Sequence, residues 1–178
     1  MVTAAGARLV AVDGPDCAGK TTLADALAAR LTAARLSVDD FLAPAAARHA
    51  RGELSPEGCY RDSHDLASFA AAVRAASGPV VVDGVFLLRP ELRGLWHLAV
   101  LLDVAEEETL RRAVVRDTAV MGTPGEVERR YRARYLPAQD LYRREARPHA
   151  HADVVVGNDD PAAPVVLRWV APGRGPRR

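Results

Sequence analysis

Short apolar runs recur along the chain, and none shows the alternation of polar and apolar residues that is typical of a half-exposed strand. Continuous apolar runs of this length are typical of strands buried on both faces, as in a parallel sheet. The runs that we expect to form strands are 8–13, 80–83, 98–103 and 154–156, with a weaker candidate at 37–39.

Between the expected strands, apolar residues recur at the spacing of a helix face. Leu23, Leu27 and Leu31 lie four residues apart and predict an amphipathic helix after residue 19. The other segments that we expect to be helical are 65–77, 106–116 and 126–147. Pro137 is expected to break the last of these, because proline lacks the N–H that the helix ladder needs. The segments that contain glycine and proline and are expected to be mostly loop are 42–63 and 118–125.

Strands and helices alternate from one end of the chain to the other. This order predicts a three-layer α/β domain, with a mostly parallel five-stranded sheet and helices on both faces. We expect one domain over residues 1–171 and a disordered tail at 172–178. Ligands of such sheets bind beyond the carboxyl ends of the strands, so acidic chemistry is expected at that edge. The aspartates expected there are Asp13, Asp39, Asp83 and Asp103.

Composition excludes several classes of protein. The 178 residues are 49% hydrophobic and 26% charged, which is enough apolar material for a buried core. A net charge of +1 argues against a nucleic-acid partner, because phosphate binding would require a strong basic excess. There is no apolar run long enough for a membrane span and no visible signal peptide, so we expect no membrane partner and a cytoplasmic location. The sequence leaves a homo-oligomer open.

The most informative motif follows the first expected strand. Residues 14–21 fit the phosphate-loop pattern G-x-x-x-x-G-K-[ST] at every fixed position. Gly14 and Gly19 allow the backbone N–H groups to point at phosphate oxygens, Lys20 supplies a charge for the β- and γ-phosphates, and Thr21 offers a hydroxyl to Mg²⁺. The residues expected to bind ATP are therefore Gly14, Pro15, Asp16, Cys17, Ala18, Gly19, Lys20, Thr21 and Thr22.

Lys20 is also the sole lysine among 24 lysine and arginine residues. It occupies a position where arginine is a poor substitute, because a planar guanidinium cannot replace a compact ammonium inside a phosphate loop. This placement supports a working phosphate site.

Phosphoryl transfer also needs a carboxylate near Mg²⁺ and a base for the acceptor hydroxyl. Asp83, at the end of the expected strand 80–83, is the candidate metal ligand together with Thr21. Asp39 and Asp40 are adjacent candidates for the base. Neighbouring side chains of an extended segment point to opposite sides, so one of the two is expected to face the site.

Arginines are the candidates for neutralising charge on the transferred phosphoryl group. Arg112 and Arg116 are four residues apart on one helix face and are expected to lie on a lid at about 112–130. The arginines of 126–147 are expected to be mostly solvated.

These motifs, in this order, resemble the uridine kinase, phosphoribulokinase and pantothenate kinase group of phosphate-loop (P-loop) kinases. The segments with the resemblance are the phosphate loop, Asp39-Asp40-Phe41, Val82-Asp83-Gly84, Arg111-Arg112 through Arg116-Asp117, Tyr135-Leu136-Pro137 and 152–156.

The resemblance implies a P-loop nucleoside triphosphate hydrolase fold and several roles. It implies that Asp39 is the general base, that Arg112 and Arg116 clamp phosphates as catalytic residues beside Lys20, and that adenine lies at the loop around Asn158. It also implies an acceptor site after the Asp-x-Phe segment. The residues that we expect to bind the acceptor are Asp39, Arg51, Tyr60 and Asp65.

The function expected from these features is ATP- and Mg²⁺-dependent phosphoryl transfer to a hydroxyl of a small molecule, with a nucleoside such as uridine favoured. A nucleoside monophosphate kinase or another small-metabolite kinase stays open, because Arg48, Arg51 and Arg61 would suit a phosphate on the acceptor. A nucleotide-binding regulator without turnover is the alternative outside the enzymes.

Overall fold

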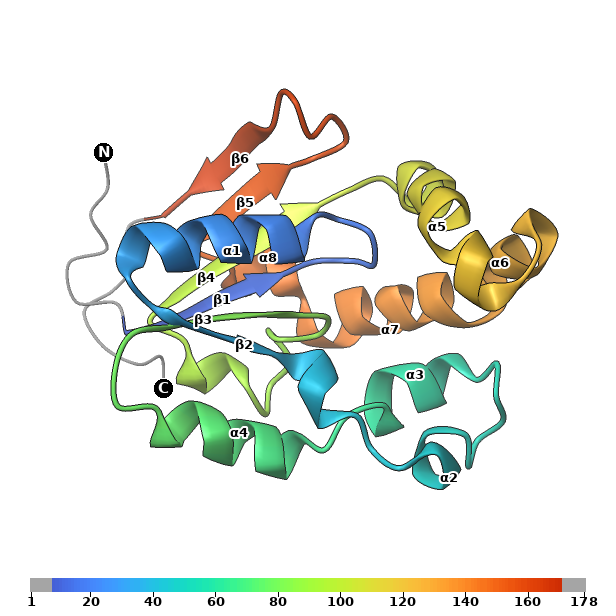
Figure 1. Cartoon of the computed structure of the whole chain (residues 1–178), viewed down its shortest axis with the longest axis horizontal. Coiled ribbons are helices and arrows are strands. Elements are labelled where there is room, and N and C mark those ends of the chain that lie inside the picture. The colour runs from blue at the N-terminus through green and yellow to red at the C-terminus, as the bar shows by residue number, and fades with distance from the viewer. Residues whose placement is uncertain (1–7, 171–178) are drawn as a thin grey trace.

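The computed structural model describes residues 8–170 and contains one six-stranded sheet in the order β2-β3-β1-β4-β5-β6 (Figure 1). Neighbouring strands from β2 to β5 are parallel, and β6 is antiparallel to β5. The strands are β1 Leu9–Asp13, β2 Ala34–Ser37, β3 Val80–Gly84, β4 Leu98–Asp103, β5 Val154–Gly157 and β6 Val165–Trp169. The mostly parallel sheet is therefore confirmed.

Two details of the expected sheet are wrong. The described residues form six strands instead of five, because the apolar run Val165–Trp169 pairs with β5 as an exposed edge strand. The weak strand expected at 37–39 lies earlier, at Ala34–Ser37. The chain then forms the 3₁₀ turn η1 (Val38–Phe41), where the Ser37 hydroxyl accepts a hydrogen bond from the Asp39 N–H at 3.3 Å and ends the strand.

Helices cover both faces of the sheet, which confirms three layers (Figure 1). The α-helices are α1 Lys20–Leu31, α2 Ala45–Arg48, α3 Pro56–Asp62, α4 Leu66–Ala75, α5 Glu106–Met121, α6 Pro124–Arg130, α7 Leu136–Ala146 and α8 Pro148–His151. Helix α1 packs on the face that presents Val10, Val12 and Val81. Helices α3, α4 and α7 pack on the other face, against Ala11 and Val82. Helices α5 and α6 lie beyond the carboxyl ends of the strands (Figure 1).

Both segments expected to be mostly loop contain helix. The segment 42–63 holds α2 and α3. Helix α3 begins at Pro56, and the hydroxyl of Ser55 accepts a hydrogen bond from the N–H of Gly58 at 3.1 Å, as a capping residue does. In 118–125, α5 continues to Met121 and α6 begins at Pro124. Both helices begin with a capping residue followed by proline, Ser55 before Pro56 and Thr123 before Pro124, and this combination starts a helix as well as it marks a loop.

Pro137 does not break the last long helix. A π-helical turn, η3 (Tyr131–Tyr135), joins α6 to α7, and Pro137 lies in the first turn of α7. Proline is tolerated in the first turn of a helix, because the N–H groups there have no hydrogen-bond partner within the helix. No helix among the described residues is long and apolar enough to cross a membrane. The tail expected at 172–178 lies outside the described residues.

Candidate functional site

The phosphate loop connects β1 to α1, and its glycines have a geometry that other residues would not tolerate. Gly14 has φ +151°, and a Cβ there would lie 2.7 Å from the carbonyl oxygen of Leu102. Gly19 has φ +88° and precedes the first residue of α1, Lys20. The backbone therefore curls beneath the N-terminus of α1, which is the arrangement that binds phosphates in this class of loop.

A buried carboxyl group fixes the start of this loop. Asp13 is fully buried and accepts hydrogen bonds from the N–H of Gly14 at 2.7 Å and the N–H of Leu88 at 3.0 Å. The hydroxyl of Tyr142 on α7 also donates to it. Burial raises the pKa of Asp13, and the three donors oppose that shift. Asp13 is thus a structural anchor for the loop and does not face the cavity described next.

The loop lines a cavity of about 480 Å³, which we call the phosphate-loop cavity. It is formed by residues 16–22 together with Asp39, Asp83, Val85, Arg112 and Arg116. The structure therefore brings together most of the residues that the sequence suggested for phosphate binding with those suggested for Mg²⁺, for the base and for charge neutralisation. Gly14 and Pro15 of the predicted phosphate loop do not line this cavity.

Thr21 and Asp83 fit a magnesium ion shared with nucleotide phosphates. The Thr21 hydroxyl donates a hydrogen bond to Asp83 Oδ2 at 3.1 Å, and Asp83 is 3% exposed. Arg35 lies 2.8 Å from Asp83 Oδ1 and compensates its buried charge. One hydroxyl and one carboxylate suit Mg²⁺, which usually completes its shell with phosphates and waters. The described residues contain no cluster of three or more His, Cys, Asp or Glu side chains that could hold a metal by itself.

Of the two candidate bases, Asp39 faces the site and Asp40 does not. Asp39 lines the phosphate-loop cavity, whereas Asp40 contributes to neither that cavity nor the one beside it. His64 Nε2 lies 3.4 Å from Asp39 Oδ1. This hydrogen bond is the main cause of a lowered pKa at Asp39, and the charges of Lys20 and Arg116 act in the same direction. Asp39 is therefore ionised at neutral pH, as a base must be.

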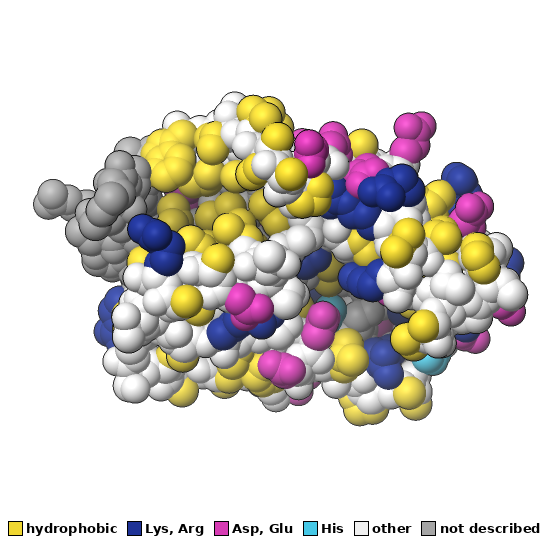
Figure 2. All heavy atoms as spheres, turned by 45° about the horizontal axis from the view of Figure 1, so that its top comes forward, with side chains coloured by type: hydrophobic (Ala, Val, Ile, Leu, Met, Phe, Trp, Pro, Cys, Tyr) yellow, Lys and Arg dark blue, Asp and Glu magenta, His cyan; other side chains and the backbone are white. Residues whose placement is uncertain are grey.

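A second cavity of about 180 Å³, which we call the adjoining cavity, lies next to the first. The two share Asp16, Asp39 and Val85. Three arginines, Arg48, Arg130 and Arg134, line the adjoining cavity alone, together with Tyr135, Cys59 and the two histidines His49 and His64. Figure 2 shows Lys, Arg and His side chains gathered around a hollow on the side of the molecule where α5 and α6 lie.

The three side chains that the sequence suggested for the acceptor, besides Asp39, do not line this cavity. Tyr60 is 2% exposed and packs in the core, where its ring cannot stack on a ligand. Arg51 is exposed and pairs with Asp62 at 2.6 Å. Asp65 caps α4 by accepting a hydrogen bond from the Ser68 N–H at 3.0 Å. Other side chains of the same segment, such as Arg48, His49 and His64, line the adjoining cavity instead.

Arg134 is a residue of the site that the sequence analysis expected to be solvated. It is 6% exposed, and its Nη1 donates to the carbonyl oxygen of Glu53 at 2.6 Å. A signal for its burial was present in the sequence. Val127, Tyr131, Arg134 and Ala138 recur at helical spacing, and all four are buried.

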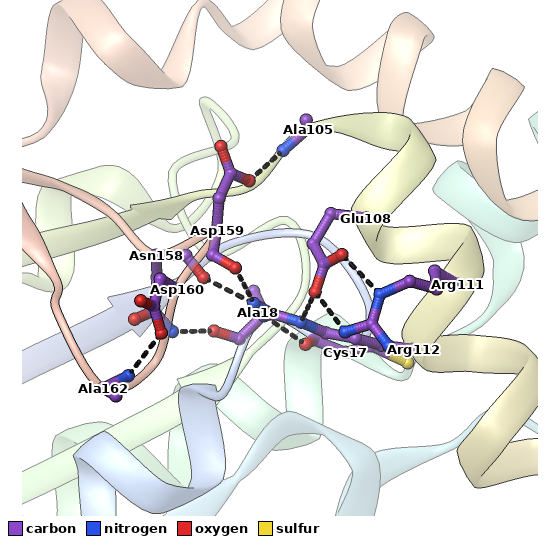
Figure 3. Close-up of polar contacts among 10 residues, drawn as sticks. All are labelled: Cys17, Ala18, Ala105, Glu108, Arg111, Arg112, Asn158, Asp159, Asp160 and Ala162. Carbon is purple, nitrogen blue, oxygen red and sulfur yellow. Dashed lines mark hydrogen bonds and ion pairs between the residues drawn. The ribbon is translucent and has the colours of Figure 1, made fainter.

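Arg112 ties three segments together (Figure 3). Its guanidinium donates to the carbonyl oxygens of Cys17 at 3.2 Å, Asn158 at 2.7 Å and Asp159 at 2.8 Å, and to Glu108 at 2.6 Å. The Asn158 side chain donates in turn to the carbonyl oxygen of Ala18 at 2.8 Å. Helix α5, the phosphate loop and the loop after β5 are thereby held in one arrangement.

Arg116 lies one turn further along α5. It pairs with Asp117 at 2.6 Å and donates to the Tyr131 hydroxyl at 3.2 Å. Its side chain is 56% exposed, so the guanidinium has access to the phosphate-loop cavity that it lines. Arg112 and Arg116 do share one face of a helix, whereas a lid motion stays a prediction.

The fold and the loop define a P-loop nucleotide-binding domain. A family model described as AAA domain matches residues 9–147, and the chain belongs to this family. A search of curated proteins finds no match.

Several solved structures that are described as kinases have the same fold as this chain. A possible uridine kinase from Bacillus stearothermophilus is 21% identical, with a TM-score of 0.65 over 86% of this chain and 90% of that one. A putative fructose transport system kinase from Silicibacter sp. TM1040 is 20% identical, with a TM-score of 0.66 over 82% and 89%. A shikimate kinase from Bacteroides thetaiotaomicron is 16% identical, with a TM-score of 0.53 over 86% and 88%. The resemblance to uridine kinase-like P-loop kinases is thus confirmed in the fold.

Proposed function

We propose that the protein is a kinase that transfers the γ-phosphoryl group of ATP to a hydroxyl of a small molecule. One observation supports this above the others. Asp39 lies where the phosphate-loop cavity meets the adjoining cavity. A base in that position can reach a hydroxyl bound on one side and a phosphate bound on the other, which is what direct transfer requires.

Five side chains of the phosphate-loop cavity have a part in the proposed reaction: Lys20, Thr21, Asp39, Asp83 and Arg116. Lys20 and the loop N–H groups bind the phosphates, and Thr21 and Asp83 would hold Mg²⁺, which neutralises phosphate charge when bound. Asp39 accepts the proton of the acceptor hydroxyl. At the same time the hydroxyl oxygen of the acceptor forms a bond to the γ-phosphorus of ATP, and the bond from that phosphorus to the β–γ bridging oxygen breaks, which releases ADP. Arg116 offers its charge to the transferred group.

We place adenine beside the loop after β5. A cavity of about 520 Å³ there is lined by Gly157, Ala163, Val165 and Leu167, among others. These apolar surfaces suit a flat base, and Asn158 connects this loop to the phosphate loop.

A nucleoside such as uridine was the acceptor favoured from the sequence, and it stays part of the proposal as one candidate among small hydroxyl compounds. A nucleoside monophosphate or another metabolite is the alternative that the arginines of the adjoining cavity support.

The free thiols Cys17 and Cys59 suit the reducing cytoplasm, where ATP is abundant. Burial raises the pKa of the Cys59 thiol to about 12, so it is not a nucleophile.

The test is ADP formation with ATP, Mg²⁺ and a panel of nucleosides, nucleotides and small hydroxyl compounds. Asp39→Asn should lower kcat by about 10²- to 10⁴-fold, the contribution typical of a general base, while ATP still binds. Asp40→Asn is the matched control, because it removes the neighbouring charge outside both cavities, and it should turn over like the wild type. Equal turnover by Asp39→Asn and wild type would remove Asp39 as the base. ATP binding without ADP formation for any compound would support a nucleotide-binding regulator instead.

A further inference from the structure

The arginines of the adjoining cavity differ in how their charges are balanced. Arg130 pairs with Glu53 at 2.7 Å, and Arg51 and Arg61 nearby each pair with a carboxylate at 2.6 Å. Within residues 8–170, Arg48 and Arg134 have no carboxylate at ion-pair distance. Two guanidinium groups that line this cavity therefore have no ion-pair partner among the described residues.

The hydrogen-bond positions of these two arginines are also incompletely used. Nε of Arg48 is buried and has no hydrogen-bond partner. Arg134 is 6% exposed and donates through Nη1 to the carbonyl oxygens of Glu53 and Ser55, at 2.6 and 3.4 Å. A buried, unpaired cation costs free energy unless an anion completes it. Both side chains line the same small cavity, which is where such an anion would fit.

The acidic residues of the cavity lie elsewhere or are neutralised. Glu53 is paired with Arg130. Asp16 and Asp39 belong to the part shared with the phosphate-loop cavity, whereas Arg48 and Arg134 line the adjoining cavity alone. The cavity thus has an acidic side toward the phosphate loop and a basic side away from it.

We propose that the acceptor bears a carboxylate or a phosphate as well as the hydroxyl, and that Arg48 and Arg134 bind this anion. The proposal rests on the proposed kinase function and names its substrate class. With the anion at the basic side, the rest of the molecule extends toward Asp39, which places its hydroxyl at the junction of the two cavities. Guanidinium groups form charge-assisted, often bidentate hydrogen bonds with both anions. A neutral nucleoside would leave both guanidinium groups without an ion-pair partner, and that of Arg134 is buried.

Three matched pairs of compounds test whether the acceptor needs a negative charge. The pairs are glycerate and glycerol, gluconate and sorbitol, and uridine 5′-monophosphate and uridine. We expect ADP formation with an anionic member, at a kcat/KM at least about tenfold above its neutral partner, because a charge-assisted hydrogen bond contributes about 1.5–3 kcal/mol. Preference for the carboxylates or for the monophosphate identifies which anion the site takes. A neutral member that is turned over as well as its anionic partner would overturn the proposal and leave the kinase function standing.

Two variants locate the effect. Arg48→Gln should raise KM for the anionic acceptor by about tenfold with a much smaller change in kcat. Arg51→Gln is the control, because it removes a charge from the same segment outside the cavity, and its KM should match the wild type. Equal KM values for the two variants would overturn the role of Arg48.

A binding measurement separates the two proposals. The protein is saturated with a non-hydrolysable ATP analogue and Mg²⁺, so that the phosphate loop is filled, and titrated calorimetrically with the three anionic compounds. Binding to the wild type and to Arg51→Gln with similar Kd values, and binding to Arg48→Gln that is weaker by about tenfold, would support the anion site even if no compound is turned over. No binding of any anionic compound would overturn it.

Discussion

Arg112 offers a sharp test of whether α5 is tied to the nucleotide site. Its neighbour Arg111 also pairs with Glu108, at 2.7 Å (Figure 3), but its side chain is 66% exposed and its hydrogen bonds within residues 8–170 are to Glu108 alone. Arg112 is 13% exposed on its side chain and reaches the carbonyl oxygens of Cys17 and Asn158 as well. The hydrogen bonds of Arg111 and Arg112 together lower the pKa of Glu108 to about 2. The two arginines thus differ in what they connect, which makes Arg111→Gln a matched control for Arg112→Gln.

The expected loss follows from the hydrogen bonds. Arg112→Gln removes the part-buried bonds to the Cys17 and Asn158 carbonyl oxygens, each worth about 1 kcal/mol. The bond to Asp159 is exposed and adds little. The free energy of unfolding should therefore fall by about 2 kcal/mol, which lowers the urea midpoint by roughly 1 M at a typical slope of about 2 kcal/mol/M. Arg111→Gln should leave the midpoint unchanged.

Urea unfolding followed by circular dichroism, together with ATP titration, measures both consequences. ATP binding should weaken by about tenfold in Arg112→Gln, because the phosphate loop and the loop after β5 lose their common tie. The control variant Arg111→Gln should bind ATP with the same affinity as the wild type. If Arg112→Gln and Arg111→Gln unfold at the same urea concentration, the three-segment tie does not contribute to stability and the reasoning is refuted.

Three further outcomes are expected. Tyr142→Phe should lower the free energy of unfolding by about 2 kcal/mol in urea titrations, because buried Asp13 loses a donor; an unchanged midpoint would contradict its anchoring role. His64→Gln should move the acid limb of the kcat/KM profile to higher pH, since the hydrogen bond from His64 holds the pKa of Asp39 down; a fixed limb would contradict this. Thr21→Val should raise the Mg²⁺ concentration needed for turnover by about tenfold or more, whereas Thr21→Ser should not.

Most of the lining of the phosphate-loop cavity could be predicted from the sequence because that part of the cavity is local. Gly14, Gly19, Lys20 and Thr21 belong to one loop, and a strand and a helix at fixed positions around it determine its shape. The parallel sheet then determines which other residues approach this loop, so an aspartate at the end of β3 could be expected beside Thr21. Local pattern and sheet topology together were sufficient there.

The lining of the adjoining cavity was less predictable, because it depends on which face of the short helix α3 packs inward. Tyr60 and Cys59 are neighbours on α3, yet Cys59 lines the adjoining cavity and the ring of Tyr60 packs against Phe86. Helix α3 is only seven residues long, and its apolar pattern does not fix its rotation. Arg134 is buried for a different reason: it shares a helix face with buried Tyr131, and this helical spacing outweighs its charge.

The position of Asp39 depends on residues that touch no ligand. Ser37 is the last residue of β2 and lies opposite Asp83 in the register with β3. The candidate base, Asp39, follows Ser37 by two residues and therefore emerges beside the candidate metal ligand. The turn that places Asp39 begins at Val38, whose side chain packs on Gly84; a Cβ at Gly84 would lie 2.1 Å from its Cγ1. Glycine at the end of β3 therefore lets the turn approach the sheet closely enough for both acids to line one cavity. The arrangement of Asp39 and Asp83 at this edge of the sheet thus depends on the contact between Val38 and Gly84 as well as on the two acids themselves.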